Sequence, residues 1–186
     1  MNDNFKKDSK YLSLILRHEP EKIGLKLDPQ GWAEVDVLLD LLSRKGRRIS
    51  RARLQAIVDT NDKKRFAFSE DGLRIRANQG HSVEVDLALE PTSPPAVLYH
   101  GTATRFEASI REQGLIKQSR QHVHLSDDLE TAMKVGLRHG KPLILTVNTA
   151  AMLRDGHVFY LSQNGVWLTD SVAVQYLRFP DEVDGS

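Results

Sequence analysis

The sequence predicts an α+β protein of two lobes, on the strength of three observations. Apolar residues recur at helical spacing between residues 12 and 58, and two short alternating segments follow at 65–76. The second half of the chain instead holds a series of short apolar runs, the pattern of β-strands. A stretch rich in Pro, Thr and Ser separates the halves, so we place the boundary near 90–96 and the lobes at 1–92 and 93–186.

The N-terminal lobe is predicted to contain three helices and then a β-hairpin. Ser50 is the expected N-cap of the third helix, and "RFAFSEDGLRIR" at 65–76 is expected to fold back around its Glu-Asp-Gly turn. Three helices followed by a hairpin is the element order of a winged-helix domain. The apolar residues that define the helices are Leu12, Ile15 and Leu16, then Val35, Leu38, Leu39 and Leu42, and last Leu54, Ile57 and Val58.

The C-terminal lobe is predicted to consist mostly of short strands. Helices are expected only around 105–113 and 128–138. The expected strands are 96–102, 122–126, 142–149, 157–162, 165–169 and 174–179.

Composition is that of an ordinary globular protein, with 40% hydrophobic and 27% charged residues. The chain has no cysteine, which excludes disulfides, thiolate chemistry and any cysteine-containing zinc site. No apolar run approaches the ~20 residues that a membrane-spanning helix needs, and the N-terminus lacks the apolar core of a signal peptide. We therefore expect a cytoplasmic protein, without membrane attachment and monomeric.

Positive charge is concentrated in the first half of the chain. Residues 1–82 hold 17 Lys and Arg against 12 Asp and Glu, whereas residues 83–186 hold 9 against 13. In the run 44–53, six of ten residues are basic, which indicates contact with a nucleic acid, although a solvated basic turn has the same composition. The expected nucleic-acid contacts are Arg44, Lys45, Arg47, Arg48, Arg51 and Lys63.

Polar and cationic residues of the N-terminal lobe form three candidate anion contacts. Arg17 and His18 follow the buried run of the first helix in "SLILRHEPEKIGL", where they either complement the helix C-terminus or bind an anion. Arg65 precedes the hairpin, and its planar guanidinium suits two phosphate oxygens at once. After the hairpin, Gln79 and His81 of "RANQGHS" can line a polar pocket.

Two stretches of the C-terminal lobe combine strands with polar side chains. His100, Gly101 and Thr102 end the predicted strand "LYHGT", where glycine admits a ligand to the backbone and the other two offer hydrogen bonds. Alternation in "SRQHVHLS" predicts one polar strand face formed by Arg120, His122, His124 and Ser126. Two histidines at i, i+2 can bind a metal, but no carboxylate accompanies them, so contacts to an anion and a sugar are favoured.

Six stretches, in this order, resemble motifs of the RNA 2′-phosphotransferase family of the KptA type. The resemblance covers about Lys10 to Leu177, and it rests on the order of all six stretches rather than on any single one. They are "LSLILRHEPEKIGLKLDPQGW", "NDKKRF", "IRANQGHS", "LYHGT", "GLIKQSRQHVHLS" and "GVWLT".

The resemblance implies an N-terminal winged-helix lobe that binds RNA and a C-terminal, β-rich, ADP-ribosyltransferase-like lobe that binds NAD. It implies NAD as co-substrate, 2′-phosphorylated RNA such as a tRNA splice junction as substrate, and no metal. The family's catalytic tetrad falls on Arg17, His18, Arg65 and Arg120. The NAD contacts fall on His100, Gly101, Thr102 and Ser126, and weaker contacts to the phosphate or sugar fall on Gln79 and His81.

The implied reaction has two steps. The RNA 2′-phosphate first attacks the nicotinamide ribose C1″ of NAD⁺ and expels nicotinamide, which leaves an ADP-ribosylated RNA. The ribose O2″ then attacks the phosphorus, which releases RNA with a 2′-hydroxyl and ADP-ribose 1″,2″-cyclic phosphate. The three arginines would hold the phosphate, and His18 would carry the proton.

One residue departs from the family pattern, and two other functions stay open. Gln118 occupies a position where an apolar residue, often methionine, is expected. An ADP-ribosyltransferase that modifies nucleic-acid ends would stop after the first step, while one that modifies proteins would have a late glutamate, where "NGVWLTDSV" offers only Asp170. A non-enzymatic winged-helix regulator with a ligand-binding lobe is the third possibility.

Overall fold

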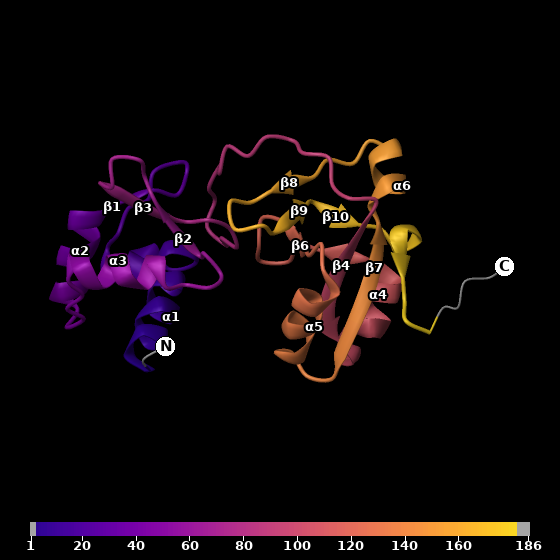
Figure 1. The fold of residues 1–186 in the computed structure, drawn as a ribbon, viewed down its shortest axis with the longest axis horizontal. Coiled ribbons are helices and arrows are strands. Elements are labelled where there is room, and N and C mark those ends of the chain that lie inside the picture. Colours follow the sequence, from indigo (N-terminus) through magenta and orange to yellow (C-terminus); the bar gives the residue numbers. More distant parts are fainter. Residues whose placement is uncertain (1–2, 182–186) are drawn as a thin grey trace. The chain divides into compact units, whose positions relative to one another are not determined.

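The computed structural model describes residues 3–181 and is a mixed α+β protein (Figure 1). Its chain divides into two compact units, one reaching to Ala88 and the other beginning at Leu89. Each unit has its own cluster of buried apolar side chains. We refer to these as the N-terminal and C-terminal units and describe each one by itself.

The N-terminal unit contains the three predicted helices, which are α1 (Asp3–Arg17), α2 (Val35–Arg44) and α3 (Arg51–Asp59). The Ser50 hydroxyl accepts a hydrogen bond from the Arg53 backbone N–H at 3.1 Å, which confirms it as the N-cap of α3. A short 3₁₀ helix, η1 (Pro20–Ile23), was not predicted. Proline suits the first turn of such a helix because its missing N–H would have no partner there.

A small antiparallel sheet completes this unit, in the order β1 (Ala33–Glu34), β3 (Arg74–Ala77), β2 (Phe66–Phe68). The predicted hairpin is confirmed, with Phe66 opposite Ala77 and Phe68 opposite Ile75. Gly72 has φ +70° in its turn, a conformation that glycine adopts without steric cost.

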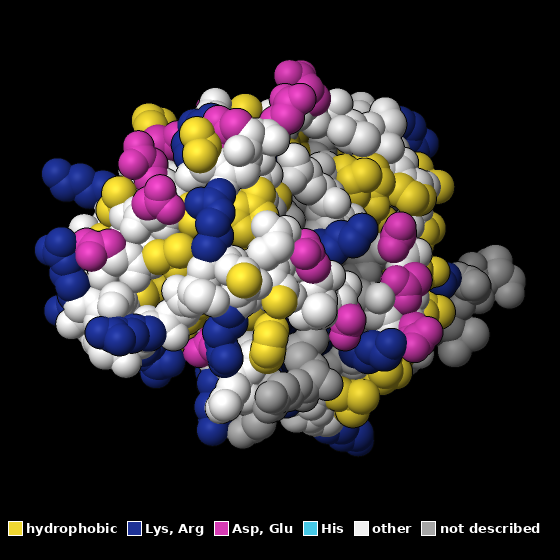
Figure 2. All heavy atoms as spheres, turned by 60° about the vertical axis from the view of Figure 1, so that its left-hand side comes forward, with side chains coloured by type: hydrophobic (Ala, Val, Ile, Leu, Met, Phe, Trp, Pro, Cys, Tyr) yellow, Lys and Arg dark blue, Asp and Glu magenta, His cyan; other side chains and the backbone are white. Residues whose placement is uncertain are grey.

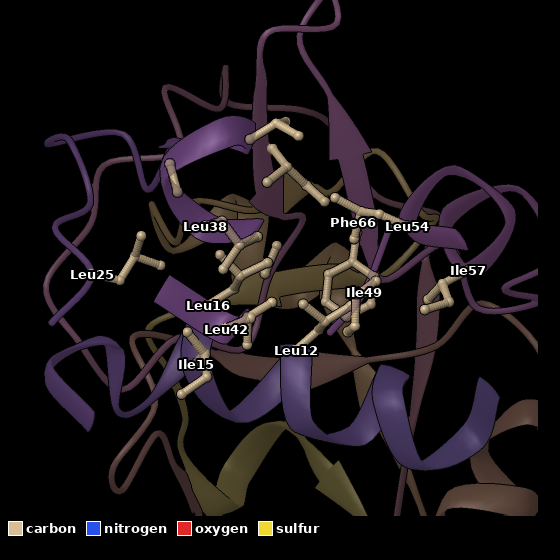
Figure 3. Close-up of a cluster of buried hydrophobic side chains, with 14 of the residues drawn as sticks. Leu12, Ile15, Leu16, Leu25, Leu38, Leu42, Ile49, Leu54, Ile57 and Phe66 are labelled. Carbon is tan, nitrogen blue, oxygen red and sulfur yellow. The ribbon is translucent and has the colours of Figure 1, made fainter. Parts of the chain in front are cut away.

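The core of the N-terminal unit lies between the helices and the sheet (Figure 3). The helical apolar residues named from the sequence supply most of it: Leu12, Ile15 and Leu16 from α1, Leu38 and Leu42 from α2, and Leu54 and Ile57 from α3 are at most 2% exposed. Phe66 and Ile75 of the hairpin pack into the same cluster. Spacing of i, i+3, i+4 thus marked the buried face of each helix correctly.

The C-terminal unit is built from antiparallel strand pairs. One sheet has the order β11 (Leu177–Arg178), β7 (Pro142–Asn148), β4 (Val97–Ala103), and another has the order β6 (Val123–Leu125), β9 (Trp167–Thr169), β8 (Tyr160–Leu161). A third pair joins β10 (Ser171–Val172) to β5 (Leu115–Ile116). Tyr99 and Ser126 exchange backbone hydrogen bonds at 2.8 Å, which ties β4 to the chain leaving β6.

Short helices flank these strands. The structure has η2 (Thr104–Phe106), α4 (Glu107–Gln113), α5 (Leu129–Leu137), α6 (Thr149–Arg154) and η3 (Val174–Tyr176). Helix α5 packs closely on β4 (Figure 1). A Cβ atom added at Gly101 would lie 1.8 Å from the Ala132 carbonyl oxygen, so glycine is required at this point of β4 for the helix to approach.

Several predicted strands are shorter than expected or partly helical. The segment 174–179 forms η3 before its two-residue strand, and only Tyr160 and Leu161 are extended within 157–162. Helix α6 starts at Thr149 because the Asn148 side chain accepts a hydrogen bond from the Ala151 N–H at 3.0 Å. These runs have strand-like composition, but local caps and turns decided their backbone.

No helix in the described part of the chain is long and apolar enough to span a membrane. Within residues 3–181 there is also no group of three or more His, Asp or Glu side chains arranged to hold a metal ion.

Candidate functional site

A cationic pocket of about 400 Å³ in the N-terminal unit brings together two of the predicted site residues, Arg17 and Arg65. Two lysines of α1, Lys6 and Lys10, line it as well, and no acidic side chain does. Four positive charges without a carboxylate make a site for an anion of several charges. The remaining lining residues are Phe5, Ser9, Ser13, Ile57, Thr60 and Asn61.

The end of α1 is held by the segment that follows the hairpin. The backbone N–H groups of Ser82 and Val83 donate to the Arg17 carbonyl at 2.9 and 3.3 Å. The Ser82 hydroxyl lies 2.9 Å from Nδ1 of the His18 ring. The backbone bonds join the helix end to a segment more than sixty residues away, and the Ser82 hydroxyl gives the exposed His18 ring a hydrogen-bond partner from that segment.

The loop that presents Arg65 is clamped by Asn78. The Asn78 side-chain amide donates to the Lys64 carbonyl at 2.5 Å, and its backbone N–H donates to the Arg65 carbonyl at 2.9 Å. Lys64 itself has φ +40°, a conformation that costs a non-glycine residue free energy. The buried Asn78 thus fixes the turn that sets the direction of Arg65.

His81 is buried, at 1% exposure, and neither ring nitrogen has a hydrogen-bond partner. Burial is the main cause that lowers the pKa of His81 to about 4, and the neighbouring side chains of Arg17, His18 and Arg76 act in the same direction. A Cβ added at Gly31 would come within 3.3 Å of the ring, so the pocket around His81 is tight. The imidazole is therefore neutral at neutral pH and is enclosed by the N-terminal unit. Gln79, two residues earlier, is half-buried.

In the C-terminal unit, the hydrogen bonding of the His100 ring defines its tautomer. Its Nδ1 lies 2.9 Å from the His124 backbone carbonyl, which can only accept, so Nδ1 carries the proton. Burial lowers the pKa of His100, with Arg120 and His139 lowering it further against the effect of that hydrogen bond. A neutral ring with a protonated Nδ1 leaves Nε2 as a hydrogen-bond acceptor.

Arg120 lies in a turn rather than in the strand that was predicted to carry it. Only residues 123–125 of that stretch are extended, so the expected single polar face over Arg120, His122, His124 and Ser126 is wrong for its first two members. Two residues before Arg120, Gln118 takes a left-handed φ of +51°, so the backbone is not extended at that point. Arg120 nevertheless reaches His124, with Nη1 3.3 Å from Nδ1.

The predicted NAD contacts of β4 differ in exposure. Thr102 is buried, and His100 and Ser126 are half-buried. The side of Gly101 where a ligand was expected is filled by the backbone of α5. Glycine at this position therefore serves the packing of the helix, and only its backbone groups are available for a contact.

Much of the basic run 44–53 is engaged within the N-terminal unit. Arg44 pairs with Asp40 at 2.7 Å, Arg51 reaches Asp36 and the Gly72 carbonyl, and Arg53 pairs with Asp8 at 2.6 Å. Arg47 lies over the Tyr11 ring, 4.0 Å from its centre. On the face shown in Figure 2, the dark-blue Lys and Arg side chains are dispersed, with acidic side chains between several of them.

Sequence reasoning did not find Asn78. It placed Ser82 with Gln79 and His81 as a residue that can line a polar pocket, but it did not predict the contact of Ser82 with His18, which forms because the segment after the hairpin returns to α1. Lys6 and Lys10 could have been found, because with Ser13 and Arg17 they occur at i, i+4, i+7 and i+11 and so share one face of α1.

The structure is thus a two-unit α+β protein whose N-terminal unit contains a pocket lined by four cationic side chains. Comparison with known proteins shows the family. Residues 3–171 match the model of the family described as RNA 2′-phosphotransferase, Tpt1/KptA. Proteins named "Probable RNA 2′-phosphotransferase" are 57% identical to the chain in Flavobacterium johnsoniae, covering 96% of this chain and 99% of that protein, and 55% identical in Hahella chejuensis, covering 97% of each.

The chain belongs to the RNA 2′-phosphotransferase (Tpt1/KptA) family, a family of transferases that use NAD. A relative from Fusobacterium nucleatum with the same name is 52% identical over 95% of this chain and 99% of its own length.

Proposed function

We propose that this chain transfers the 2′-phosphate of an RNA to NAD⁺-derived ADP-ribose, using Arg17, His18, Arg65 and Arg120 as its catalytic residues. The N-terminal unit would be a winged-helix lobe that binds the RNA, and the C-terminal unit an ADP-ribosyltransferase-like lobe that binds NAD⁺. The observation that carries the proposal is the pocket in which Arg17 and Arg65 meet without an acidic residue.

A 2′-phosphate fits this pocket on charge and geometry. It is already an anion, so the first step, in which its oxygen bonds to C1″ as the bond to nicotinamide breaks, needs no base. The guanidinium groups of Arg17 and Arg65 can each donate two hydrogen bonds to phosphate oxygens. Donors set in place beforehand typically supply ~3–4 kcal/mol each where charge develops in a transition state.

His18 is proposed to move the proton in the second step. There the O2″–phosphorus bond forms, the bond from phosphorus to the RNA O2′ breaks, and one proton passes from O2″ to O2′. An imidazole whose orientation is held by Ser82 at Nδ1 suits a transfer of this kind. Arg120 is proposed to stabilise the same phosphate from the C-terminal unit.

Residues of β4 and β6 fit the recognition of a ribose. The Nε2 atom of His100 is an acceptor, so it can receive a hydrogen bond from a ribose hydroxyl. Thr102, Ser126 and the backbone of Gly101 complete the proposed NAD⁺ contacts. When bound, NAD⁺ supplies the electrophilic ribose carbon and the leaving nicotinamide.

An ADP-ribosyltransferase acting on proteins is less consistent with the site. The acid nearest to the expected late glutamate is Asp170, which is exposed and pairs with Lys117 at 2.6 Å. The alternative is an enzyme that modifies nucleic-acid ends and omits the second step. Its product is a nucleic acid that keeps the ADP-ribose, whereas the proposed reaction releases RNA with a 2′-hydroxyl.

The first experiment incubates the protein with an oligoribonucleotide that carries one internal 2′-phosphate, with and without NAD⁺, and resolves products by mass spectrometry. We expect loss of the phosphate only with NAD⁺, together with ADP-ribose cyclic phosphate. An oligonucleotide that gains ADP-ribose and keeps it would establish the alternative, and an unchanged oligonucleotide would refute both.

Separate variants test the assigned roles. Arg65→Ala is expected to lower kcat/KM at least about 100-fold through loss of a phosphate donor. Arg154→Ala, which removes an exposed arginine outside the proposed site, is the matched control and is expected to leave kcat/KM close to the wild-type value. Equal losses in the two variants would show that Arg65 contributes general charge rather than a specific contact.

A further inference from the structure

The cationic pocket extends beyond the two arginines that the proposed reaction uses. Lys6, Lys10, Ser13 and Arg17 line it from one face of α1, and Thr60, Asn61 and Arg65 line it from the end of α3 and the loop that follows. Because an α-helix rises ~1.5 Å per residue, Lys6 and Arg17 are about 16 Å apart along the axis. A single phosphate group is too small to contact both Lys6 and Arg17.

The two lysines differ from most cations of this unit in their contacts. Neither Lys6 nor Lys10 forms an ion pair or a hydrogen bond with any residue in the described part of the chain, and both are exposed. The arginines of 44–53 differ, because three of them pair with acidic residues. Placing unpaired positive charges side by side along one helix face costs free energy unless an anion lies beside them.

Polar side chains also line the pocket between Lys6 and Arg17. Ser13 stands between Lys10 and Arg17 on the same face of α1, and Ser9 and Asn61 form a buried hydrogen bond at 3.2 Å that closes the floor. The Thr60 hydroxyl donates to the Ala56 carbonyl at 2.6 Å and ends α3 against the pocket. The pocket therefore offers the Ser13 hydroxyl and the two ammonium groups as donors to an extended ligand.

We propose that this face of α1 is a subsite for the RNA backbone next to the 2′-phosphorylated nucleotide, with Lys6 and Lys10 each neutralising a phosphodiester. The inference rests on the proposed function, because it takes Arg17 and Arg65 as the end that holds the 2′-phosphate. Successive phosphates of a polynucleotide strand are several ångströms apart, so about 16 Å of helix face can pass more than one of them. The enzyme would then recognise a polynucleotide rather than a single phosphorylated nucleotide.

The test compares three RNAs: a dinucleotide with one internal 2′-phosphate, and the same dinucleotide extended by several nucleotides on its 5′ or its 3′ side. Affinity is measured by fluorescence anisotropy without NAD⁺, and kcat/KM is measured with it. The wild type is expected to prefer one of the extended RNAs. In the double variant Lys6→Gln/Lys10→Gln, the ratio of kcat/KM on the extended RNA to kcat/KM on the dinucleotide is expected to fall toward one, and so is the ratio of the two affinities.

Salt dependence gives a second readout that a packing defect would not mimic. For a single strand, the logarithm of the binding constant falls with the logarithm of the salt concentration, with a slope of about −0.7 per neutralised phosphate. Removal of both lysines should therefore make this slope shallower by about 1.4. Between 50 and 200 mM salt, the wild type should lose about sevenfold more affinity than the double variant. The control Lys26→Gln/Lys141→Gln removes two exposed lysines outside the pocket and should keep the wild-type slope and ratio.

The outcomes separate this inference from the proposed function. Equal kcat/KM on all three RNAs, or an unchanged slope in the double variant, would overturn the subsite and leave the function standing. Lysine-dependent binding of an extended RNA that keeps its phosphate would uphold the subsite and overturn the proposed function. A slope that falls equally in the control would show that only net charge matters and would overturn the subsite.

Discussion

At the scale of single residues, one buried side chain affects the electrostatics beside the proposed site. His81 is enclosed beside Arg17, His18 and Arg76, with no hydrogen-bond partner for either ring nitrogen in the described part of the chain. A protonated ring there would place another positive charge beside the two guanidinium groups. Burial and these neighbours therefore keep His81 neutral at neutral pH.

The first prediction concerns His81 and stability against pH. The pKa is about 4 in the fold and near 6.5 in the unfolded chain. As pH falls below about 6.5, the unfolded chain binds the proton first, so this residue costs no stability above that pH and about 2 kcal/mol at pH 5. The loss is complete once pH falls below about 4.

His81→Leu removes this titration. In urea unfolding, we expect the variant to lose about 2 kcal/mol less than the wild type between pH 7 and pH 5. Its stability at pH 7 reports the effect on packing separately. The same pH dependence in both proteins would mean that the folded ring accepts a proton as easily as the unfolded one.

The second prediction concerns Ser82, which holds the His18 ring at 2.9 Å. Ser82→Ala is expected to lower kcat about tenfold, equivalent to ~1.4 kcal/mol of transition-state stabilisation, with little change in KM for RNA. Ser82→Thr keeps the hydroxyl and should restore most of kcat. A rise in KM at unchanged kcat would instead place Ser82 in substrate binding.

At the scale of elements, the contact between α5 and β4 has almost no free space. Gly101 of β4 and Gly136 of α5 both face the backbone of the opposite element. The strand–helix approach therefore depends on two positions without a side chain. This explains a glycine within a strand, where it otherwise weakens the sheet.

The third prediction follows from that contact. Gly101→Ala would put a Cβ 1.8 Å from the Ala132 carbonyl oxygen, so α5 must shift, and we expect a loss of at least about 3 kcal/mol in the free energy of unfolding. Gly46→Ala is the comparison, since its Cβ meets nothing within 4 Å and it should cost only ~1–2 kcal/mol for its φ of +76°. Equal costs, measured by denaturant unfolding, would refute close packing as the cause.

At the scale of the whole molecule, the two apolar clusters share no residue. One draws on residues from Leu12 to Ala77 and the other on residues from Leu98 to Phe179. A core that is complete within one segment needs no partner segment to form.

The fourth prediction is that each unit folds alone. Fragments 1–88 and 89–186, made separately, should each show a single cooperative urea transition and the circular dichroism of its own elements. The physical reason is that each fragment contains every residue of its own apolar cluster. A non-cooperative transition in either fragment would show that its core needs the other unit.

Most elements of the N-terminal unit could be predicted because they depend on local patterns. Spacing of apolar residues, the cap at Ser50 and the Glu-Asp-Gly turn each act within a few residues. The C-terminal unit was harder to predict, since runs such as 174–179 have strand composition but partly helical backbone. For strands of two or three residues, the neighbours in space outweigh propensity.

Local residue order was enough to predict the α+β class, the helices with their buried faces and the hairpin, and several motifs together indicated the family. The folded chain was needed to find that Ser82 contacts His18, that Asn78 holds the Arg65 loop, that His81 is buried and neutral, and that Gly101 serves packing. These properties depend on contacts between residues far apart in the chain. Burial, hydrogen bonding and pKa are set by such neighbours, which residue order alone does not specify.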